Sequence, residues 1–341
     1  MTNDGSIPAG MMPVALDAMG GDFGPSETVP AAIKAASTGS VAIALVGDPA
    51  QLQAELDKHD GAARLPIQVV PSEGVVTEDE HPALAFRSKP KASVFVAAGV
   101  VKAGKAKAFV SMGSTGASIA AATVVFGTMD GVERGALGGP IVGFSPNMVI
   151  IDLGTNMDSR PQQLLDFAAL GGLMSRLVYR SDNPRVALLS VGAEEGKGNR
   201  LVRETTELLK TSSLNFIGNV EANDLPFGKA EVVICDGFVG NVILKLTEAL
   251  GDAVVSEIKS ALGDSPEGQG LARTIFEKMN TLKAFGGGPI LGVNGVAVVG
   301  HGRARASSIA SAISTAKHVV EIGFVEASAK ELAKVRAEVE I

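Results

Sequence analysis

The sequence contains little cysteine, no excess of basic residues and no long apolar run, and each shortage excludes a class of protein. Cys235 is the single cysteine among 341 residues, so an internal disulfide and a cysteine-rich zinc site are excluded. The formal net charge is −7 at pH 7, whereas the phosphates of nucleic acids favour a basic face. No apolar stretch reaches the roughly 18 residues of a membrane-spanning helix, and no secretory signal is visible. We therefore expect a cytoplasmic protein that binds no nucleic acid.

Several cofactor-binding and catalytic motifs are missing as well. No Gly-x-Gly-x-x-Gly follows a strand with an acidic residue about twenty positions later, so nicotinamide binding has no support in the sequence. The sequence also lacks a nucleophile elbow and the Gly-Lys-Ser/Thr ending of a nucleotide P-loop. Acidic residues at the ends of separate strands suggest a divalent metal site but do not fix its geometry; they are Asp17, Asp22, Asp152, Asp158 and Asp236.

What is present is an alternation of short apolar runs with helical patterns, which is typical of parallel βα units. Several runs are apolar on both faces, as expected for a sheet that helices cover on each side. The predicted strands span residues 13–17, 41–47, 67–70, 106–111, 140–145, 148–154, 185–192, 231–237 and 296–302. A short turn at residues 145–147 predicts one antiparallel hairpin. The length allows two intimately joined domains, but without a linker or repeat we expect a single α/β domain over residues 1–341.

Residues 241–285 differ, because two helical patterns follow each other with no strand between them. The polar segment GDSPEGQG joins them, so the sequence predicts a helical hairpin arm. Its first helix has an apolar stripe, which is typical of a dimer contact or of core packing; the stripe consists of Ile243, Leu246, Leu250, Val254 and Ile258. Basic residues beside apolar ones leave contact with a membrane surface as the alternative; they are Arg273, Lys278 and Lys283.

Ligands of open parallel sheets bind beyond the carboxyl ends of the strands, so the loops at those ends are the candidate site. After residues 106–111, Gly113 and Gly116 loosen a turn in which Ser114 and Thr115 stand where a helix would start. Free amide groups and hydroxyls at such a point favour an anion. A plain N-cap role for Ser114 is the alternative.

Other strand ends have polar residues too, namely Asn156, Asp158, Lys197, Asp236, Asn241 and His301. A lysine beside two glycines can reach an anion, and a histidine at a strand end is a candidate proton donor. Asp158 can instead cap the helix that follows it. Loops built of glycine, Ser, Thr and Asn favour a transferase that binds an anion through positioned donors.

Specific motifs recur at these strand ends: LDAMGGDFGP, SMGSTGA, IDLGTNMDSRPQQL, NPRVALLSVGAEEGKGN, DGFVGNVILK and GGGPILGVNGVAVVGHG. In order and spacing they resemble the bacterial phosphate acyltransferase family PlsX, over roughly residues 13–320. The resemblance implies a three-layer α/β/α sandwich with a mainly parallel sheet, similar to phosphotransacetylases and isopropylmalate dehydrogenases. It also implies a homodimer without a metal or an organic cofactor.

The resemblance further implies the reaction and its setting. The family transfers a long-chain acyl group from acyl carrier protein to inorganic phosphate, and the product is an acyl phosphate. Its members are cytosolic and associate peripherally with the membrane. There a glycerol-3-phosphate acyltransferase consumes the acyl phosphate for phospholipid synthesis.

In the mechanism that we expect, bound phosphate attacks the thioester carbonyl directly. The loop that holds phosphate consists of Gly113, Ser114, Thr115 and Gly116. The family usually has Asn at the position of Ser114, so amide chemistry is not essential there. We expect a further set to shape the loops rather than to bind substrate: Asp17, Gly20, Gly21, Asp22, Asp158, Asp236, Gly237 and Gly240.

Four residues are the catalytic candidates. We expect Asn156 and Asn241 to donate hydrogen bonds to the carbonyl. Lys197 would offset the charge of the phosphate dianion, and His301 would protonate the departing thiolate. After His301 the family commonly has small hydroxyl residues, whereas this chain has Arg303.

Acyl carrier protein is acidic, so an acidic enzyme needs a local basic patch to dock it. The candidates are Arg87, Lys89 and Lys91, with Lys102, Lys105 and Lys107. An ordinary solvated charged surface is the alternative. Two other functions stay open, namely a dehydrogenase of similar fold that needs NAD(P) and a metal, and a non-catalytic scaffold between carrier protein and membrane.

Overall fold

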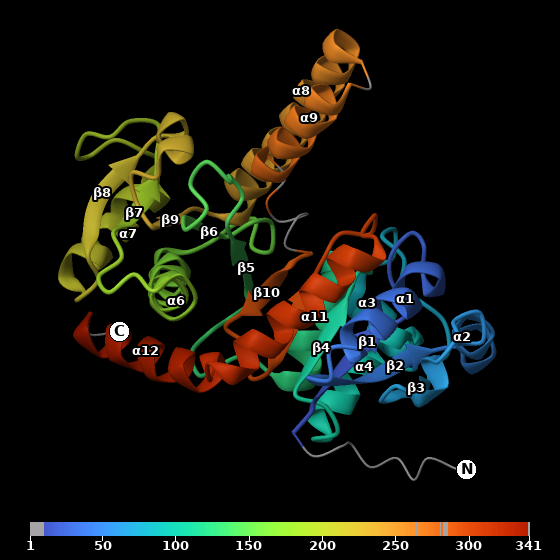
Figure 1. Cartoon of the computed structure of the whole chain (residues 1–341). Coiled ribbons are helices and arrows are strands. Elements are labelled where there is room, and N and C mark those ends of the chain that lie inside the picture. Colours follow the sequence, from blue (N-terminus) through green and yellow to red (C-terminus); the bar gives the residue numbers. More distant parts are fainter. Residues whose placement is uncertain (1–9, 264, 280, 282–285, 340–341) are drawn as a thin grey trace. The chain divides into compact units, whose positions relative to one another are not determined.

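The computed structural model describes residues 10–263, 265–279, 281 and 286–339, and Figure 1 shows their helices and strands. The chain divides into two compact units. The first unit comprises Met1–Met129 and Phe285–Val325, and the second comprises Asp130–Ala284 and Glu326–Ile341. Each unit contains strands of its own with helices packed against them. The single domain expected from the sequence stays a prediction.

The strands of the first unit are parallel except for the last one. Their order is β3-β2-β1-β4-β11-β10, and only the β10–β11 pair among them is antiparallel within the described residues. In β1, Val14, Ala15 and Leu16 are fully buried, which explains why this run shows no polar alternation. The bounds are β1 Met12–Asp17, β2 Val41–Gly47, β3 Ile67–Pro71, β4 Ala108–Ser111, β10 Gly288–Leu291 and β11 Val296–Val299.

Helices cover both faces of these strands. Helix α1 packs against α11, as Figure 1 shows, and α4 packs against α5. Proline begins α1, α2 and α3, where its missing N–H leaves no hydrogen bond unmade. The bounds are α1 Pro25–Ala36, α2 Pro49–Leu56, α3 Pro82–Ser88, α4 Ser93–Lys102, α5 Thr115–Ala121 and α11 Ala306–Glu321, with the short helical segments η1 Ala62–Arg64 and η2 Ala122–Phe126.

The second unit repeats the design with shorter strands. Their order is β5-β6-β9-β7-β8, with β5 antiparallel to β6 and the other pairs parallel. Arg336 of α12 forms a two-pronged ion pair with Asp166 of α6, with N···O distances of 2.8 and 2.6 Å, and so holds these helices together. The bounds are β5 Ala136–Gly139, β6 Val149–Ile151, β7 Val186–Leu189, β8 Phe216–Val220, β9 Val232–Ile234, α6 Pro161–Tyr179, α7 Arg200–Thr211, η3 Ala222–Phe227 and α12 Phe324–Glu338.

The mainly parallel α/β fold is confirmed, and the differences from the predicted strands have local causes. The antiparallel hairpin exists, but its first strand is β5, so the strand expected at residues 140–145 is wrong. In β5, Gly138 lies opposite Ile151, and a Cβ at Gly138 would collide with the Ile151 side chain. A strand of alanine, leucine and glycine gives no β-branched signal. The strands β8 and β10 were also not predicted; each is short, and β8 contains Gly218 and Asn219.

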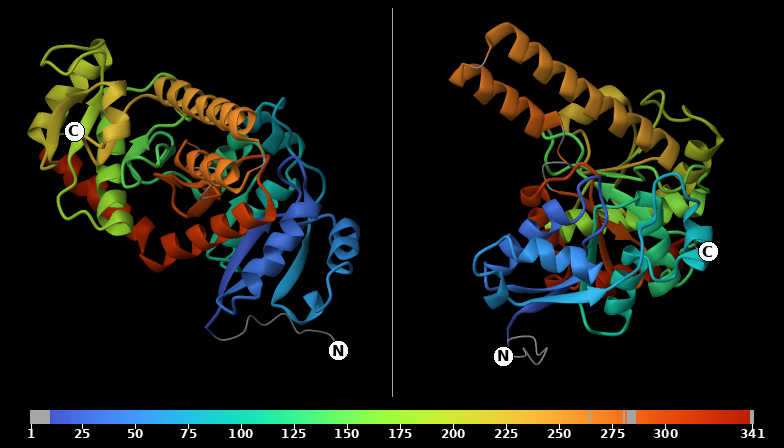
Figure 2. Two further views of the ribbon diagram at one scale, coloured as in Figure 1. Left: turned by 45° about the horizontal axis from the view of Figure 1, so that its top comes forward. Right: turned by 90° about the vertical axis from the view of Figure 1, so that its right-hand side faces the viewer.

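The predicted hairpin arm is confirmed and consists of α8 Gly237–Leu262 and α9 Pro266–Met279. Figures 1 and 2 show these helices side by side and projecting from the strands of the second unit. The first helix begins at Gly237 rather than at 241, because the Asp236 carboxylate accepts a hydrogen bond of 2.8 Å from Val239 N and caps it. The part of the second pattern at residues 280 and 282–285 lies outside the described residues.

The two faces of α8 have different surroundings. Leu244 and Gly251 are buried, and small residues of α9, Gly268 and Ala272, are buried as well. The predicted stripe turns away from them, because Leu246 is 57%, Leu250 49% and Val254 41% exposed. Core packing within this chain is therefore wrong for these three residues, whereas Ile243, at the start of the stripe, packs against buried core residues of the second unit. Among the described helices, none is long and apolar enough to cross a membrane.

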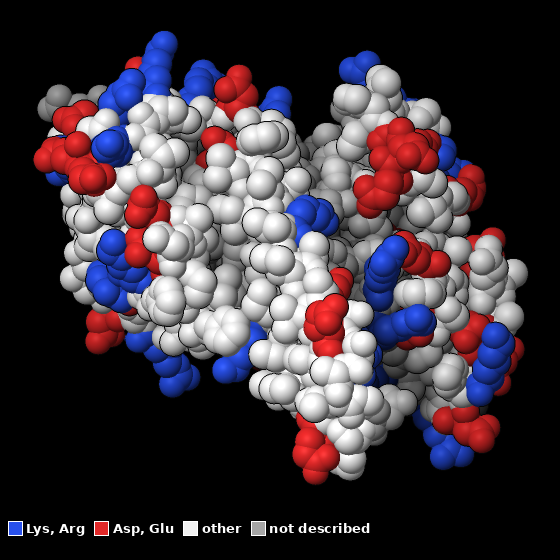
Figure 3. All heavy atoms as spheres, turned by 90° about the horizontal axis from the view of Figure 1, so that it is seen from above, with Lys and Arg blue, Asp and Glu red and all other residues white. Residues whose placement is uncertain are grey.

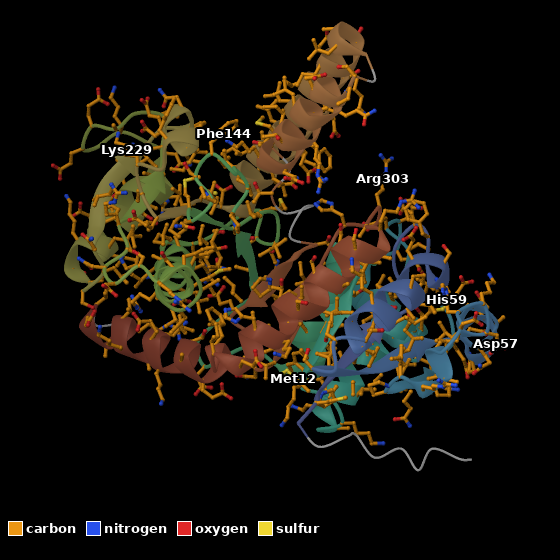
Figure 4. The ribbon with its side chains drawn as sticks, in the orientation of Figure 1. Met12, Asp57, His59, Phe144, Lys229 and Arg303 are labelled. Atoms are coloured by element: carbon orange, nitrogen blue, oxygen red, sulfur yellow. The ribbon has the colours of Figure 1, made fainter. Side chains whose placement is uncertain are left out.

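The base of the arm is fixed to the loop that precedes β6. Gly143 N donates a hydrogen bond of 2.7 Å to the carbonyl oxygen of Lys278. The Lys278 ammonium lies 5.1 Å from the centre of the Phe144 ring, which Figure 4 labels, so a cation–π contact adds to this attachment.

Candidate active site

A buried carboxylate organises the strand ends of the first unit. Asp17, the last residue of β1, is 1% exposed. The Ser111 hydroxyl donates a hydrogen bond of 2.7 Å to its Oδ2, and Gly20 N donates one of 3.2 Å to its Oδ1. Burial raises the pKa of Asp17, while these hydrogen bonds oppose the rise. The serine was not predicted, although parallel pairing of two strands sets Asp17 opposite Ser111.

This carboxylate brings together the loops that follow β1 and β4. A Cβ at Gly20 would lie 2.7 Å from both Asp17 Oδ2 and Gly113 N, so only glycine permits this approach. Gly113 N in turn donates a hydrogen bond of 3.0 Å to Ser111 Oγ. Gly21 has a φ of +87°, a left-handed conformation that favours glycine. The loop residues expected to shape this corner thus lie in one cluster.

The loop expected to hold phosphate leads directly into α5. Ser114 is 7% exposed and its hydroxyl accepts a hydrogen bond of 3.4 Å from Ala117 N, so the N-cap alternative is confirmed. Thr115, the first helical residue, is exposed, and Gly116 packs near Pro82, where a Cβ would come within 2.9 Å of Cγ. The exposed hydroxyl of Thr115 and the amides at this helix start remain the candidate donors.

A third loop of the first unit, after β11, joins this cluster. Gly300 N donates to the carbonyl oxygen of Ser111 at 3.0 Å, and Asp22 N donates to that of Gly302 at 2.8 Å. His301, half-buried, lies between these two contacts. The Arg303 side chain projects outward, as Figure 4 shows, with its Nε 3.8 Å from Asp22 Oδ2. Asp22 therefore joins the loops after β1 and β11.

The second unit has a corresponding buried carboxylate, Asp152, which directly follows β6 and is fully buried. Its Oδ2 accepts hydrogen bonds from Asn156 N at 2.6 Å and Asn156 Nδ2 at 2.9 Å. Leu137 N and Thr155 N donate to Oδ1, each at 3.2 Å. Burial raises the pKa of Asp152, and the hydrogen bonds from Asn156 oppose the rise most strongly. The peptide bond between Ile151 and Asp152 is cis.

The expected role of Asn156 as a donor to the substrate carbonyl is not supported. Its side-chain amide already donates to Asp152 and, at 3.0 Å, to the carbonyl oxygen of Gly135, so both N–H groups are engaged. The residue is 3% exposed, and its Oδ1 has no hydrogen-bond partner within the described chain. Asn156 therefore braces the Asp152 loop.

Glycines allow the helix α8 to start against this loop. Gly237 N donates to the carbonyl oxygen of Asn156 at 2.7 Å, and a Cβ at Gly237 would lie 2.8 Å from Asn156 N. A Cβ at Gly240 would collide with the carbonyl oxygen of Asp152. One turn on, the half-buried Asn241 side chain packs against Gly154, whose φ is +126°. Within the described residues the Asn241 amide makes no side-chain hydrogen bond, so it is the candidate donor that the structure leaves available.

The last candidates of the second unit lie on exposed loops. Lys197 is exposed, and its carbonyl oxygen accepts a hydrogen bond of 3.3 Å from Asn219 Nδ2. Asp158 is exposed and does not cap α6, because Arg160 holds that position and its N–H donates to Gln163 at 2.9 Å. Capping by Asp158 is therefore wrong.

The single cysteine and the acidic strand ends complete the set of candidate residues. Cys235 is 5% exposed and burial raises its pKa, so it packs as a small apolar residue of the core. The candidate metal ligands are divided, with Asp17 and Asp22 in the first unit and the other three aspartates in the second. Over the described ranges, no three His, Cys, Asp or Glu side chains come together as metal ligands.

Ion pairs engage two residues of the expected docking patch for carrier protein, Lys89 and Lys91. Lys89 Nζ lies 2.7 Å from Glu80, and Lys91 Nζ lies 2.8 Å from Glu73. The ammonium of Lys89 lowers the pKa of Glu80. Arg87 is exposed. On the face shown in Figure 3, basic side chains are interspersed with acidic ones. The pairing of Lys89 and Lys91 with carboxylates is typical of the solvated charged surface that was the alternative.

Comparisons with known proteins find relatives over most of the chain. A family model described as fatty acid synthesis protein matches residues 12–327. A phosphate acyltransferase of Desulfitobacterium hafniense is 39% identical over 333 residues, which cover 96% of this chain and 99% of the relative. One of Elusimicrobium minutum is 42% identical over 320 residues, with 92% and 94% covered.

Solved structures show the same fold at low identity. A phosphotransacetylase from Streptococcus pyogenes superposes with a TM-score of 0.61 and 16% identity, covering 91% of this chain and 94% of its own. The EutD phosphotransacetylase from Staphylococcus aureus reaches a TM-score of 0.55 at 17% identity, with 90% and 94% covered. The expected phosphotransacetylase-like architecture is thus confirmed.

Proposed function

Because the chain belongs to the family of fatty acid synthesis proteins, we propose that it is an acyltransferase that transfers an acyl group to inorganic phosphate. The observation that carries this proposal is the similarity to phosphate acyltransferases, which covers 96% and 92% of the chain in two relatives. The donor is a long-chain acyl thioester of acyl carrier protein, and the acyl phosphate enters phospholipid synthesis through a glycerol-3-phosphate acyltransferase.

The chemistry requires no covalent intermediate with the enzyme. An oxygen of hydrogen phosphate attacks the thioester carbonyl, a C–O bond forms and the C–S bond breaks. The proton of the phosphate ends on the departing thiolate, so acyl phosphate and free thiol leave with atoms and charge balanced. The enzyme then has to hold phosphate, stabilise the negative oxygen of the intermediate and move one proton.

In the first unit, Thr115 with the amide of Gly116 holds phosphate, and Ser114 caps the helix behind them. The expected role of Gly113 as a phosphate donor is not supported, because its N–H already donates to Ser111 Oγ, so Gly113 positions the loop instead. The proposal for this loop is supported by its attachment to Asp17 through Ser111 and Gly113. Burial raises the pKa of Asp17, and the hydrogen bonds that it accepts direct this carboxyl group at the loop backbone and at Ser111. His301 carries the proton to the thiolate.

In the second unit, Asn241 is the proposed donor to the thioester carbonyl, since its amide is not engaged by the described residues as that of Asn156 is. Lys197 is the proposed counter-charge for the dianion, and its exposure leaves the ammonium able to reach an anion. The carrier protein docks through Arg87, with Lys89 and Lys91 in a weaker role because carboxylates already pair with them.

The exposed stripe of α8 supports a homodimer as the assembled form. Phe238, Val242, Leu246, Leu250 and Val254 recur every fourth residue, and each is more than 40% exposed. An apolar face of this kind is stable in water when a second copy covers it. The same arm is the proposed place of the peripheral membrane contact of a cytoplasmic enzyme, through Arg273, which is exposed on α9.

The proposed reaction is tested by free thiol release from palmitoyl carrier protein, measured with and without phosphate. We expect release only with phosphate, together with an acyl phosphate that hydroxylamine traps. Thr115→Val should raise the KM for phosphate about tenfold, because one hydrogen bond to a charged ligand is lost. Thr38→Val, beyond the end of α1, is the matched control and should leave this KM unchanged.

The competing functions give different results in the same assay. A dehydrogenase would need added nucleotide and would lose activity with EDTA, whereas the proposed reaction survives both conditions. A scaffold would bind carrier protein without releasing thiol. Release that is equal with and without phosphate would contradict the proposal.

A further inference from the structure

An apolar cavity of about 290 Å³ lies within the second unit, among β7, β9, α7 and α8. Its walls are formed mainly by aliphatic side chains, including Leu188, Leu189, Val202, Ile234, Val239 and Ile243. Leu188 and Ile234 are almost fully buried, and Val202, Val239 and Ile243 are half-buried. None of the four catalytic candidates from the sequence lines this cavity. Of the residues expected to shape loops, Asp236 alone lines it.

The polar residues that line the cavity lie at the ends of strands or the starts of helices. They are Ser190 after β7, Asn199 before α7 and Asp236 before α8. The Asn199 and Asp236 side chains are used as caps, since they accept hydrogen bonds from Val202 N at 3.0 Å and Val239 N at 2.8 Å. The Ser190 hydroxyl is buried and has no hydrogen-bond partner among the described residues. A buried hydroxyl without a partner is unfavourable, so a rotation of the Ser190 side chain that brings it to a ligand carbonyl would be favoured.

This end of the cavity is continuous with the Asp152 loop. Asp236 lines the cavity, and the next residue, Gly237, donates its N–H to the carbonyl oxygen of Asn156. Asn241, the proposed donor to the thioester carbonyl, follows one turn later on the same helix, after Val239, which lines the cavity. Val191, also in the lining, is 83% exposed, so the polar end is also the end that opens to solvent.

The size and the lining fit an unbranched hydrocarbon chain. A methylene group occupies about as much space as a water molecule, roughly 30 Å³, so the cavity takes on the order of ten chain carbons. While such a cavity holds no hydrocarbon, its aliphatic lining lacks packing contacts, and an apolar ligand that fills it supplies them.

We propose that this cavity binds the hydrocarbon chain of the acyl substrate, with its methyl end among Leu188, Val202 and Ile234. The Ser190 hydroxyl donates a hydrogen bond to the carbonyl oxygen at the polar end. This inference rests on the proposed acyl transfer to phosphate and adds to it the place and the length of the chain. Each buried methylene strengthens binding by about fourfold, so long chains are preferred to short ones.

The test is the chain-length preference of the full-length protein. Val202→Phe places a ring in the cavity, and kcat/KM for phosphate-dependent thiol release is measured with palmitoyl and butyryl carrier protein. We expect a loss of about tenfold or more with palmitoyl and less than about twofold with butyryl, because only the long chain needs the filled space. Val178→Phe on α6, which adds the same group away from the lining, should change neither value.

A binding measurement gives a readout that does not depend on turnover. The wild-type protein should enhance the fluorescence of cis-parinaric acid, palmitate should displace this probe and butyrate should not. Val202→Phe should weaken probe binding about tenfold. If Val202→Phe does not fold, Ala222→Val makes a smaller addition to the same lining. It should lower kcat/KM with palmitoyl carrier protein severalfold and leave kcat/KM with butyryl carrier protein unchanged.

The outcomes separate this inference from the proposed function. Thiol release without any phosphate dependence in the wild type contradicts the proposed function, even where the probe binds. Phosphate-dependent release with the same palmitoyl-to-butyryl ratio in wild type and in a folded cavity variant overturns the inference and leaves the function intact. Failure of the wild type to bind the probe overturns it as well.

Discussion

The clusters around Asp17 and Asp152 differ in the kind of donor that surrounds a buried carboxylate. Asp17 accepts its shortest hydrogen bond, 2.7 Å, from the Ser111 hydroxyl. Among the described residues, all the hydrogen-bond donors to Asp152 are N–H groups, those of Leu137, Thr155 and Asn156. A hydroxyl rotates and can accept as well as donate, whereas an N–H can only donate. The Asp17 cluster therefore tolerates a change of its central residue, and the Asp152 cluster does not.

Glycine packing follows the same division. In the first cluster a Cβ at Gly20 would approach both a backbone nitrogen, Gly113 N, and a side-chain oxygen, Asp17 Oδ2. In the second, a Cβ at Gly240 would collide with the carbonyl oxygen of Asp152, which belongs to the backbone. Both positions lie against backbone atoms, but the overlap with the Asp152 carbonyl oxygen is the deeper one, and at Gly20 one of the two neighbours is a side chain that can turn away.

The largest effect is expected for Gly240→Ala. The added Cβ collides with the Asp152 carbonyl, so the free energy of unfolding should fall by about 3 kcal/mol or more. Urea unfolding measures this free energy. Gly20→Ala should cost about half as much. Gly270→Ala, where nothing lies within 4 Å of the added Cβ, is the control and should raise stability by about 0.5 kcal/mol. Equal losses at Gly20 and Gly240 would remove the contrast in packing.

A smaller but more specific effect is expected from exchanging the carboxylates for amides. Asp152→Asn should lower the free energy of unfolding by about 2 kcal/mol, because its new NH₂ group faces backbone N–H donors. Asp17→Asn should cost about 1 kcal/mol, because Ser111 can rotate and accept from the amide. Asp48→Asn, at the exposed N-cap of α2, is the control, since asparagine caps a helix equally well.

The variants Asp17→Asn and Asp152→Asn should also differ in activity. Asp17→Asn should retain most of its stability, so its KM for phosphate reports on the shape of the loop. A folded Asp152→Asn variant with full stability would contradict the argument from N–H donors.

The smallest effect is the pH dependence of stability. Burial raises the pKa of Asp17 above its ordinary value of 3.8, so its contribution to stability is full below that value and is lost as pH rises through the folded pKa. The non-titrating Asp17→Asn variant lacks this loss. The stability of wild type relative to the variant should therefore fall by on the order of 1 kcal/mol between about pH 4 and about pH 7.

Urea unfolding of both proteins across this range measures the difference, and Asp48→Asn corrects for general effects of removing a carboxylate. A difference that grows with pH would show that the hydrogen bonds to Asp17 outweigh its burial. The clusters around Asp17 and Asp152 would then differ in the strength of their hydrogen bonds rather than in their tolerance of a substitution.

Much of the architecture was predictable, because burial on both faces leaves a continuous apolar run. The strands β1 and β2 lie within a residue of their predicted bounds. The strand β5 was not predicted, because glycine has a low strand propensity. Gly138 lies in this strand because a larger residue would collide with Ile151 of the neighbouring strand. Likewise the stripe on α8 was visible in the sequence, but its exposure was not.

The site was predictable as a set of loops and less so as a set of roles. The corner from Asp17 to Gly21 was recognised by its glycines and acids, and the structure adds Ser111 from the adjoining strand as the partner of Asp17. Asn156 lost its expected role because the carbonyl of Gly135, 21 residues earlier, occupies one of its N–H groups. No local pattern contains a contact of that kind.

The sequence by itself determined the parallel α/β class, the hairpin arm and the glycine-rich strand ends, because all of these depend on side-chain periodicity and backbone conformation within short segments. Only the tertiary structure decided which donors surround Asp17 and Asp152, which amide stays available and that β7, β9, α7 and α8 enclose a cavity. These features arise where segments distant in the chain meet, and their free energy depends on distances that no single segment encodes.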